Sequence, residues 1–327
     1  MAQRILALTL GAIALGIVAG APTAAADGLP VPGVITPSGG VPGADGTHYI
    51  THTRRGATTI RELGRGDAVL QSAIVPGRFT VPAVALDGSP GGLSADGSTL
   101  ALIKPRTSFP QSRTHLLILD ANRLGFRDRL TLKGDFSFDA ISPDASLLYF
   151  IQYLSPRDPT RYAVRAYDVA AGQFLAKPIV DPNEEGPDEM RGYPLTRTVS
   201  PDGRWAYTLY DGAGKHPFIH ALDISQGRAV CIDTPSLAGR RDLDQLNLDV
   251  SGDGSALTVV HGTRPVALVN TQTFEVSNPS ESTPRTGADN SDAWRLIAPT
   301  AVVLLLGGGA LFLMLRRRGG DLAAGDA

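Results

Sequence analysis

The sequence predicts an all-β fold made of repeated sheets, and three observations support this prediction. The chain contains 37 Gly and 24 Pro among 327 residues, and such a density of turn-forming residues favours strands joined by tight turns. A short phrase containing Ser and Asp recurs four times, and a run of β-branched and aromatic residues follows each copy. Successive copies lie about 50 residues apart. A repeat of this length with several strands per unit predicts a β-propeller.

The composition excludes several classes of protein. The chain has 30 Lys+Arg against 32 Asp+Glu, and 43% of its residues are hydrophobic. Disordered and collagen-like chains lack that apolar content, and nucleic-acid-binding chains carry a charge excess, so we expect no nucleic-acid partner. Cys231 is the only cysteine. Core burial, rather than an internal disulfide, must therefore stabilise the fold.

The repeated phrase marks the start of the second strand in each predicted sheet. Its four copies are Leu93–Gly97, Ile141–Ala145, Val199–Gly203 and Val250–Gly254, and their serines are 48, 58 and 51 residues apart. The runs that follow are TLALI, LLYFIQY, WAYTLY and ALTVV. Each is followed by a third strand that ends in Asp or Asn and then by a weaker fourth strand. Four-stranded units are the consequence.

The Asp and Gly of the phrase have a structural explanation. An Asp side chain can accept hydrogen bonds from turn amides, and Gly can adopt a positive φ at no steric cost. The predicted turn residues are Asp96, Gly97, Asp144, Asp202, Gly203, Asp253 and Gly254. The second copy has Ala145 in place of the glycine. We therefore expect a negative φ there, because alanine is costly in the left-handed region.

The repeated turns and the strands that follow them make residues 79–278 resemble the WD40-like and YVTN-like β-propeller families, including the TolB-type propellers. The resemblance implies the fold and almost nothing about activity. An upstream stretch, HYITHTRRGATTIREL followed by AVLQSAIVPG, supplies three more strands without a leading one. We therefore expect about five blades, with the ring closed if the missing strand comes from the other terminus. A β-sandwich with coincidental turns is the alternative.

Both ends of the chain are predicted to be targeting segments. Residues 1–26 carry Arg4, an apolar stretch and a small-residue cleavage site, which is the pattern of a signal peptide. Residues 294–315 contain an uncharged, nearly all apolar run of 20 residues from Leu296 that is long enough to span a membrane as one helix. Three arginines follow it, so residues 316–327 are predicted to be a cytoplasmic tail. We expect the protein in the cell membrane, with its body on the extracytoplasmic side.

Between these ends we expect an N-terminal extension at 27–46, the propeller at 47–278 and a flexible stalk at 279–293. Two alternatives concern the ends. The signal peptide could be retained as an anchor, and Thr283–Gly287, which reads TPRTG, resembles a sortase signal with Thr in place of its leucine.

One loop is a candidate calcium site. The run DPNEEGPDE contains five carboxylates, and Asp181, Asn183, Glu185 and Gly186 match positions 1, 3, 5 and 6 of a calcium-binding loop. The match ends at position 12, where Gly192 replaces a bidentate Glu. A solvated acidic loop between two blades is the alternative. Ca²⁺ is thus the one cofactor that the sequence suggests.

Other chemical signals are weaker. Two histidine pairs have the spacing of metal ligands on a helix: His48 with His52, and His216 with His220. Both pairs lie in segments predicted as strands, where residues four positions apart are too distant to bind one metal ion. No G-x-S-x-G elbow is present, and Cys231 lies among apolar neighbours.

The sequence therefore favours a non-catalytic module or scaffold that binds an unidentified protein or small molecule and contacts the membrane through its C-terminal helix. A propeller hydrolase or lactonase, with a metal in the central channel, is one alternative function. An accessory subunit of an envelope or transport complex is another.

Overall fold

The computed structural model describes residues 39–184, 188–214 and 216–279, all within the first of two compact units, residues 1–282. The predicted signal peptide, the membrane helix, the cytoplasmic tail and all but the first residue of the predicted stalk lie outside these residues. Within the described part of the chain, none of the helices has the length and apolar character needed to cross a membrane.

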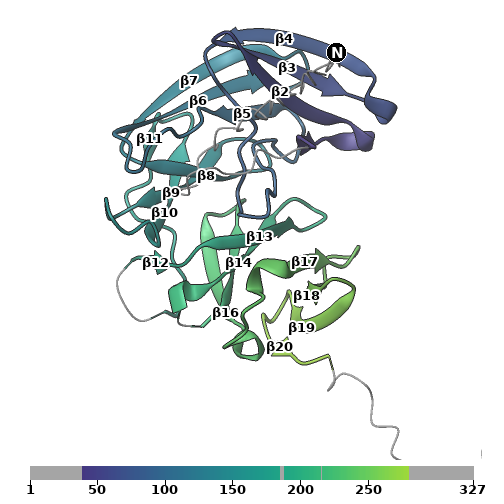
Figure 1. Ribbon diagram of the computed structural model, residues 1–327, viewed down its shortest axis with the longest axis vertical. Coiled ribbons are helices and arrows are strands. Elements are labelled where there is room, and N and C mark those ends of the chain that lie inside the picture. Colours follow the sequence, from purple (N-terminus) through teal and green to yellow (C-terminus); the bar gives the residue numbers. More distant parts are fainter. Residues whose placement is uncertain (1–38, 185–187, 215, 280–327) are drawn as a thin grey trace, which may run out of the picture. The chain divides into compact units, whose positions relative to one another are not determined.

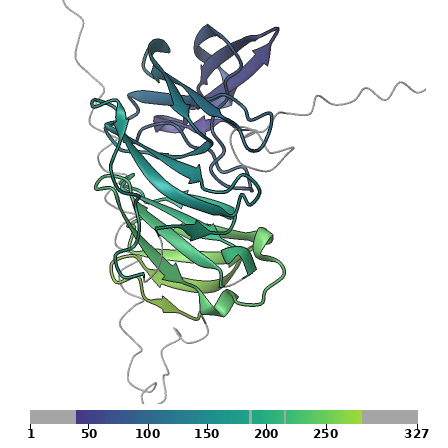
Figure 2. The same ribbon diagram turned by 90° about the vertical axis from the view of Figure 1, so that its left-hand side faces the viewer.

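The described residues form five antiparallel sheets that follow one another along the chain (Figures 1 and 2). The first sheet contains β1 (Val41–Pro42), β2 (His48–Arg54), β3 (Ala57–Leu63) and β4 (Val69–Pro76), and the second contains β5 (Thr99–Ile103), β6 (Arg113–Asp120) and β7 (Gly125–Lys133). The third contains β8 (Phe136–Ile141), β9 (Leu147–Tyr153), β10 (Arg161–Asp168), β11 (Gln173–Phe174) and β12 (Met190–Arg191). The fourth contains β13 (Pro194–Val199), β14 (Trp205–Tyr210), β15 (Phe218–Asp223) and β16 (Arg228–Asp233). The fifth contains β17 (Leu246–Val250), β18 (Ala256–His261), β19 (Arg264–Asn270) and β20 (Val276–Ser277).

The helices of the described residues are single 3₁₀ turns in the connections: η1 (Ala44–Gly46), η2 (Arg65–Asp67), η3 (Gly212–Gly214), η4 (Pro235–Leu237) and η5 (Leu243–Gln245). The prediction of an all-β fold is therefore confirmed. In each sheet the main strands pair in the order of the chain, which is the arrangement of propeller blades. The number of sheets agrees with the expected number of blades.

Two expectations about the blades were wrong. The first expectation was a ring closed by a strand from the C-terminal end. The sheets are not closed into a ring, and the first sheet begins with the short β1, directly upstream of β2. The second expectation was four strands in every unit. The second sheet has three, because residues 80–93 form no regular strand and pair with β5 only through isolated bridges at Thr80 and Leu93. Pro82 and Pro90 in this segment have no backbone N–H, so they cannot donate to a regular ladder.

Hydrophobic clusters join each sheet to the next. Side chains alternate between the two faces of a strand, so the inward set of one sheet meets the inward set of its neighbour. The four interfaces contain Ile60 with Leu100 and Leu117, Leu116 with Phe136 and Phe150, Tyr149 with Ala206 and Leu222, and Leu209 with Leu248 and Val259. Burial between successive sheets therefore stabilises the stack.

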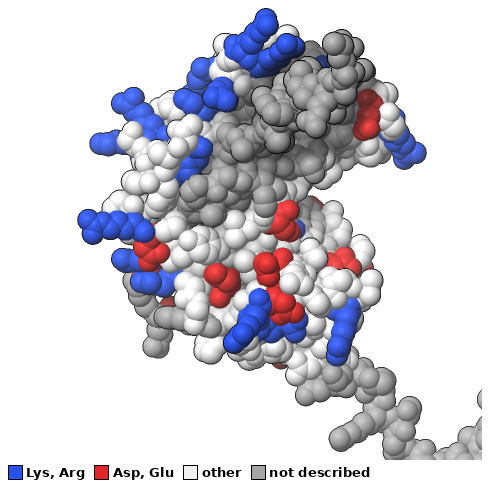
Figure 3. All heavy atoms as spheres, in the orientation of Figure 1, with Lys and Arg blue, Asp and Glu red and all other residues white. Residues whose placement is uncertain are grey.

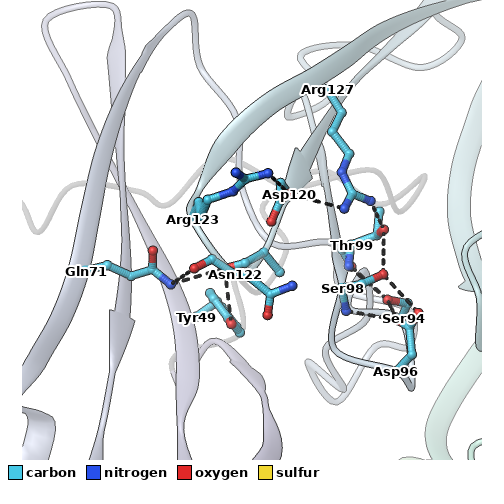
Figure 4. Close-up of polar contacts among 11 residues, drawn as sticks. Tyr49, Gln71, Ser94, Asp96, Ser98, Thr99, Asp120, Asn122, Arg123 and Arg127 are labelled. Atoms are coloured by element: carbon cyan, nitrogen blue, oxygen red, sulfur yellow. Dashed lines mark hydrogen bonds and ion pairs between the residues drawn. The ribbon is translucent and has the colours of Figure 1, made fainter.

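The four repeated turns have a common hydrogen-bond pattern, shown for the first copy in Figure 4. In each turn an Asp oxygen accepts the N–H two residues later: Ser98 to Asp96 at 2.9 Å, and Ser146 to Asp144, Arg204 to Asp202 and Ser255 to Asp253 at 3.1 Å each. The residue after the aspartate has positive φ, at 69° for Gly97, 70° for Gly203 and 72° for Gly254.

The expectation for the second copy was wrong, because Ala145 also adopts a left-handed conformation, with φ 58°. Hydrogen bonds on both sides of Ala145 hold the turn in this shape. The hydroxyls of Ser142 and Ser146 each donate to Asp144 at 2.8 Å, and the Leu147 N–H donates to the Ser142 hydroxyl at 2.9 Å. The turn bonds thus offset the steric cost of the alanine.

Candidate functional site

Asp181 of the predicted calcium loop is buried and bound within the protein. Its Oδ1 accepts hydrogen bonds from the Asn183 N–H at 2.9 Å and from Asn183 Nδ2 at 3.1 Å, and its Oδ2 accepts the Cys231 N–H at 2.8 Å. Asp181 therefore attaches this loop to β16. Glu185 lies outside the described residues. Among the residues that the structure describes, no group of three or more His, Cys, Asp or Glu side chains could hold a metal ion. The calcium loop stays a prediction.

The two histidine pairs are only partly placed as expected. His48 and His52 lie in β2, but His216 precedes β15 rather than lying in a strand. His220 is completely buried in β15, and neither ring nitrogen has a hydrogen-bond partner among the described residues. Burial lowers the pKa of His220 to about 4, so the ring is neutral at pH 7.

Two buried carboxylates lie at β8, the first strand of the third sheet. Asp135 precedes β8 and forms an ion pair with Arg106, while Asp139 lies in β8 and forms an ion pair with Arg197 of β13. The Gln111 N–H also donates to Asp135 at 2.8 Å. These carboxylates therefore bind guanidinium groups from neighbouring sheets and stabilise the packing of one sheet on the next.

A basic patch on the second sheet is the strongest candidate site, and the sequence analysis did not find it. We define it as Lys104, Arg113, His115, Arg129 and Lys133. Lys104 follows β5, and its N–H donates to the carbonyl of His115 in β6 at 2.9 Å. Across β6 and β7, Arg113 pairs with Lys133. Cross-strand partners and residues two positions apart share a face, so all five side chains lie on one face of the sheet.

The cations of the basic patch have no carboxylate partner among the described residues, although Arg129 donates to the Pro76 carbonyl at 3.4 Å and lies over the Phe79 ring. None of the ion pairs between described residues includes Lys104, Arg113, Arg129 or Lys133, and all four residues are exposed. In Figure 3, Lys and Arg over the first two sheets have few Asp or Glu near them, whereas over the later sheets Lys and Arg lie among Asp and Glu. Partial burial, together with the positive charges of Lys104, Arg113 and Arg129, lowers the pKa of His115. The patch therefore has a positive local field.

A surface hollow of about 460 Å³ adjoins this patch. Lys104, Arg113 and His115 line it together with the loop between β5 and β6, which contributes Thr107, Ser108, Pro105, Pro110, Gln111 and Ser112. None of these described lining residues is acidic. Ammonium, guanidinium, hydroxyl and amide groups all donate hydrogen bonds, and the first two carry positive charge. This arrangement can bind phosphate, sulfate or carboxylate groups.

Comparisons with known proteins show fold similarity only. No family model and no curated protein matches the sequence. Solved structures similar to this chain include Kuenenia stuttgartiensis hydrazine synthase, at 16% identity and a TM-score of 0.42 over 75% of this chain. TolB from Acinetobacter baumannii has 17% identity and a TM-score of 0.40 over 73%, and a putative TolB from Agrobacterium tumefaciens has 15% and 0.40 over 78%.

The chain spans 64% of the hydrazine synthase chain, 54% of the Acinetobacter TolB chain and 79% of the Agrobacterium chain. It therefore covers less than two thirds of the first two. At these identities the similarity transfers no activity, ligand or partner to this protein. The functional argument consequently depends on the residues of this chain.

Proposed function

We propose that this protein is a propeller-type binding module that acts outside the cytoplasmic membrane and binds ligands with phosphate, sulfate or carboxylate groups at its basic patch. One observation carries the proposal: four exposed cations share a sheet face beside a hollow, and none of them is ion-paired among the described residues. Cations that gather on one face create a positive local potential, which attracts and holds an external anion.

The proposed location comes from the sequence alone. The signal peptide at residues 1–26 and the membrane helix at residues 294–315 support export of the body and retention at the membrane. The basic patch and its hollow lie in this body, so the ligand-binding function is assigned to it.

The hollow favours a ligand with several anionic groups over a single small ion. Lys104 and Arg113 border the hollow, while Arg129 and Lys133 extend the positive face along β7. A rigid strand pair holds these positions, which reduces the ordering cost on binding. An anionic polymer or oligomer can contact successive cations along this face. A protein segment with several carboxylates has the same chemistry.

The test measures binding of polyphosphate and of dextran sulfate to the full-length chain, with uncharged dextran as the reference. We expect both anionic polymers to bind, with affinity that falls as salt rises. The double variant Lys104→Ala/Arg113→Ala should bind roughly tenfold more weakly, because each exposed cation contributes about 0.7 kcal/mol to the binding free energy.

The matched control is Arg54→Ala/Arg61→Ala, which removes the same charge from exposed positions in the first sheet. It should bind nearly as tightly as the wild type. Equal losses in the two double variants would show attraction to overall charge, and the proposed site would be rejected.

A further inference from the structure

Strand β4 differs from the last strands of the other sheets. Its eight residues, VLQSAIVP, contain no charge, and the side chains of Val69, Leu70 and Ile74 are 55%, 57% and 73% exposed. In the described structure the other last strands are either two residues long, as in β11 and β20, or carry charged residues, as in β7 and β16. Exposed edge strands are usually shortened, charged, bulged or interrupted by proline, because an open edge can pair with another strand. In β4 a bulge at Leu70 and Pro76 lie toward the two ends, and the stretch between them carries no charge.

The pairing of β4 with β3 shows which backbone groups of β4 do not bond to β3. The Gly77 N–H donates to the Gly56 carbonyl at 2.8 Å, in the register that pairs Ala57 with Pro76. Hydrogen-bonded pairs alternate along an antiparallel ladder. The N–H and C=O groups of Ser72 and Ile74 therefore point away from β3. Pro76 is in the same phase, so its missing N–H costs β3 no hydrogen bond.

This edge is complementary to a second copy of itself. In an antiparallel pair centred on Ser72, Ser72 of one copy faces Ser72 of the other, and Leu70 faces Ile74. The two exposed apolar side chains then cover each other on one face. A β-bulge at Leu70 shifts the register between β3 and β4, so the proposed alignment covers Leu70 to Ile74.

We propose that two copies of the chain associate through β4, in an antiparallel pair centred on Ser72. The two four-stranded sheets become one continuous sheet across a twofold axis, which is a self-complementary arrangement typical of homodimers. The absence of charge along β4 removes the repulsion that would prevent two identical strands from pairing. This inference does not depend on the basic patch.

The first test traps the pair in the full-length chain. Cys231, the only cysteine of the sequence, is partly exposed, so it is replaced by alanine in both cysteine variants. A Ser72→Cys variant then carries one reactive thiol, which faces its own copy at the centre of the pair. A short bismaleimide should yield a covalent dimer at least tenfold faster than in Phe126→Cys, whose position in β7 is 63% exposed. Equal rates, or no dimer from Ser72→Cys, would overturn the proposal.

The second test addresses the register by sedimentation of the full-length chain in detergent. The predicted membrane helix could associate by itself, so the readout is the difference between variants. Ile74→Lys and Leu70→Glu should each raise the dimer dissociation constant at least tenfold, because each places a charge against an apolar side chain. An equimolar mixture of the two should form the heterodimer, in which the new Lys faces the new Glu. Unchanged association of Ile74→Lys, or no recovery in the mixture, contradicts this register.

Discussion

Replacing Ala145 by glycine should stabilise the protein, although glycine in a regular strand or helix normally destabilises. Ala145 has φ 58°, and its hydrogen-bonded turn fixes that conformation. A left-handed conformation costs an L-residue about 1–2 kcal/mol, whereas the extra freedom of glycine in the unfolded chain costs about 0.4–1 kcal/mol. The net gain in the free energy of unfolding is therefore about 0.5–1 kcal/mol. For a body of this size, that gain raises Tm by roughly 1–4 °C.

The assay is thermal and urea unfolding of the full-length chain, with Gly97→Ala as the reciprocal control. Gly97 occupies the equivalent position with φ 69°, and an added Cβ would meet no atom within 4 Å. Gly97→Ala should therefore lose stability through backbone strain alone, by about 1 kcal/mol. If Ala145→Gly were destabilised by a similar amount, the assigned strain at Ala145 would be refuted.

Three further predictions concern buried groups. The pKa of His220 is about 4 in the folded state, against an ordinary value of 6.5 for histidine, so the wild type is fully stable above pH 6.5 and loses about 3 kcal/mol as pH decreases toward 4. His220→Leu should abolish this pH dependence of the free energy of unfolding, which urea unfolding across the range will measure. Arg197→Met should cost about 3–5 kcal/mol in chemical denaturation, since it leaves the carboxylate of Asp139 buried without its partner, and a loss under 1 kcal/mol would contradict the assigned ion pair. Calorimetry with Ca²⁺ should give heats that vanish in Asp181→Asn if the loop binds the ion, and flat heats in the wild type would reject the calcium loop.

Local signals in the sequence predicted the strands and turns well because the determining interactions are local. The Asp of each repeated turn bonds an amide only two residues away, so the phrase itself contains the information. Ala145 shows the limit of this reasoning. The general cost of alanine at positive φ is correct, but the serine–aspartate hydrogen bonds that the glycine-containing turns also make hold Ala145 in that conformation.

The proposed binding surface could not be predicted in the same way, because it depends on register between distant residues. Arg113 and Lys133 are 20 positions apart and meet only through the pairing of β6 with β7. The alternation of Arg129, Thr131 and Lys133 along one strand was the available signal. The acidic run at Asp181 was more conspicuous, yet that carboxylate is bound to Asn183 and to the β16 backbone.

The most direct test of the proposed function is hydrogen–deuterium exchange of the full-length chain with and without polyphosphate. Binding at the basic patch predicts added protection confined to residues 104–115 and 129–133, with the hairpin of β2 and β3 unchanged. Protection centred on the hairpin, on the loop at residues 181–184, or spread evenly over the chain would contradict the account.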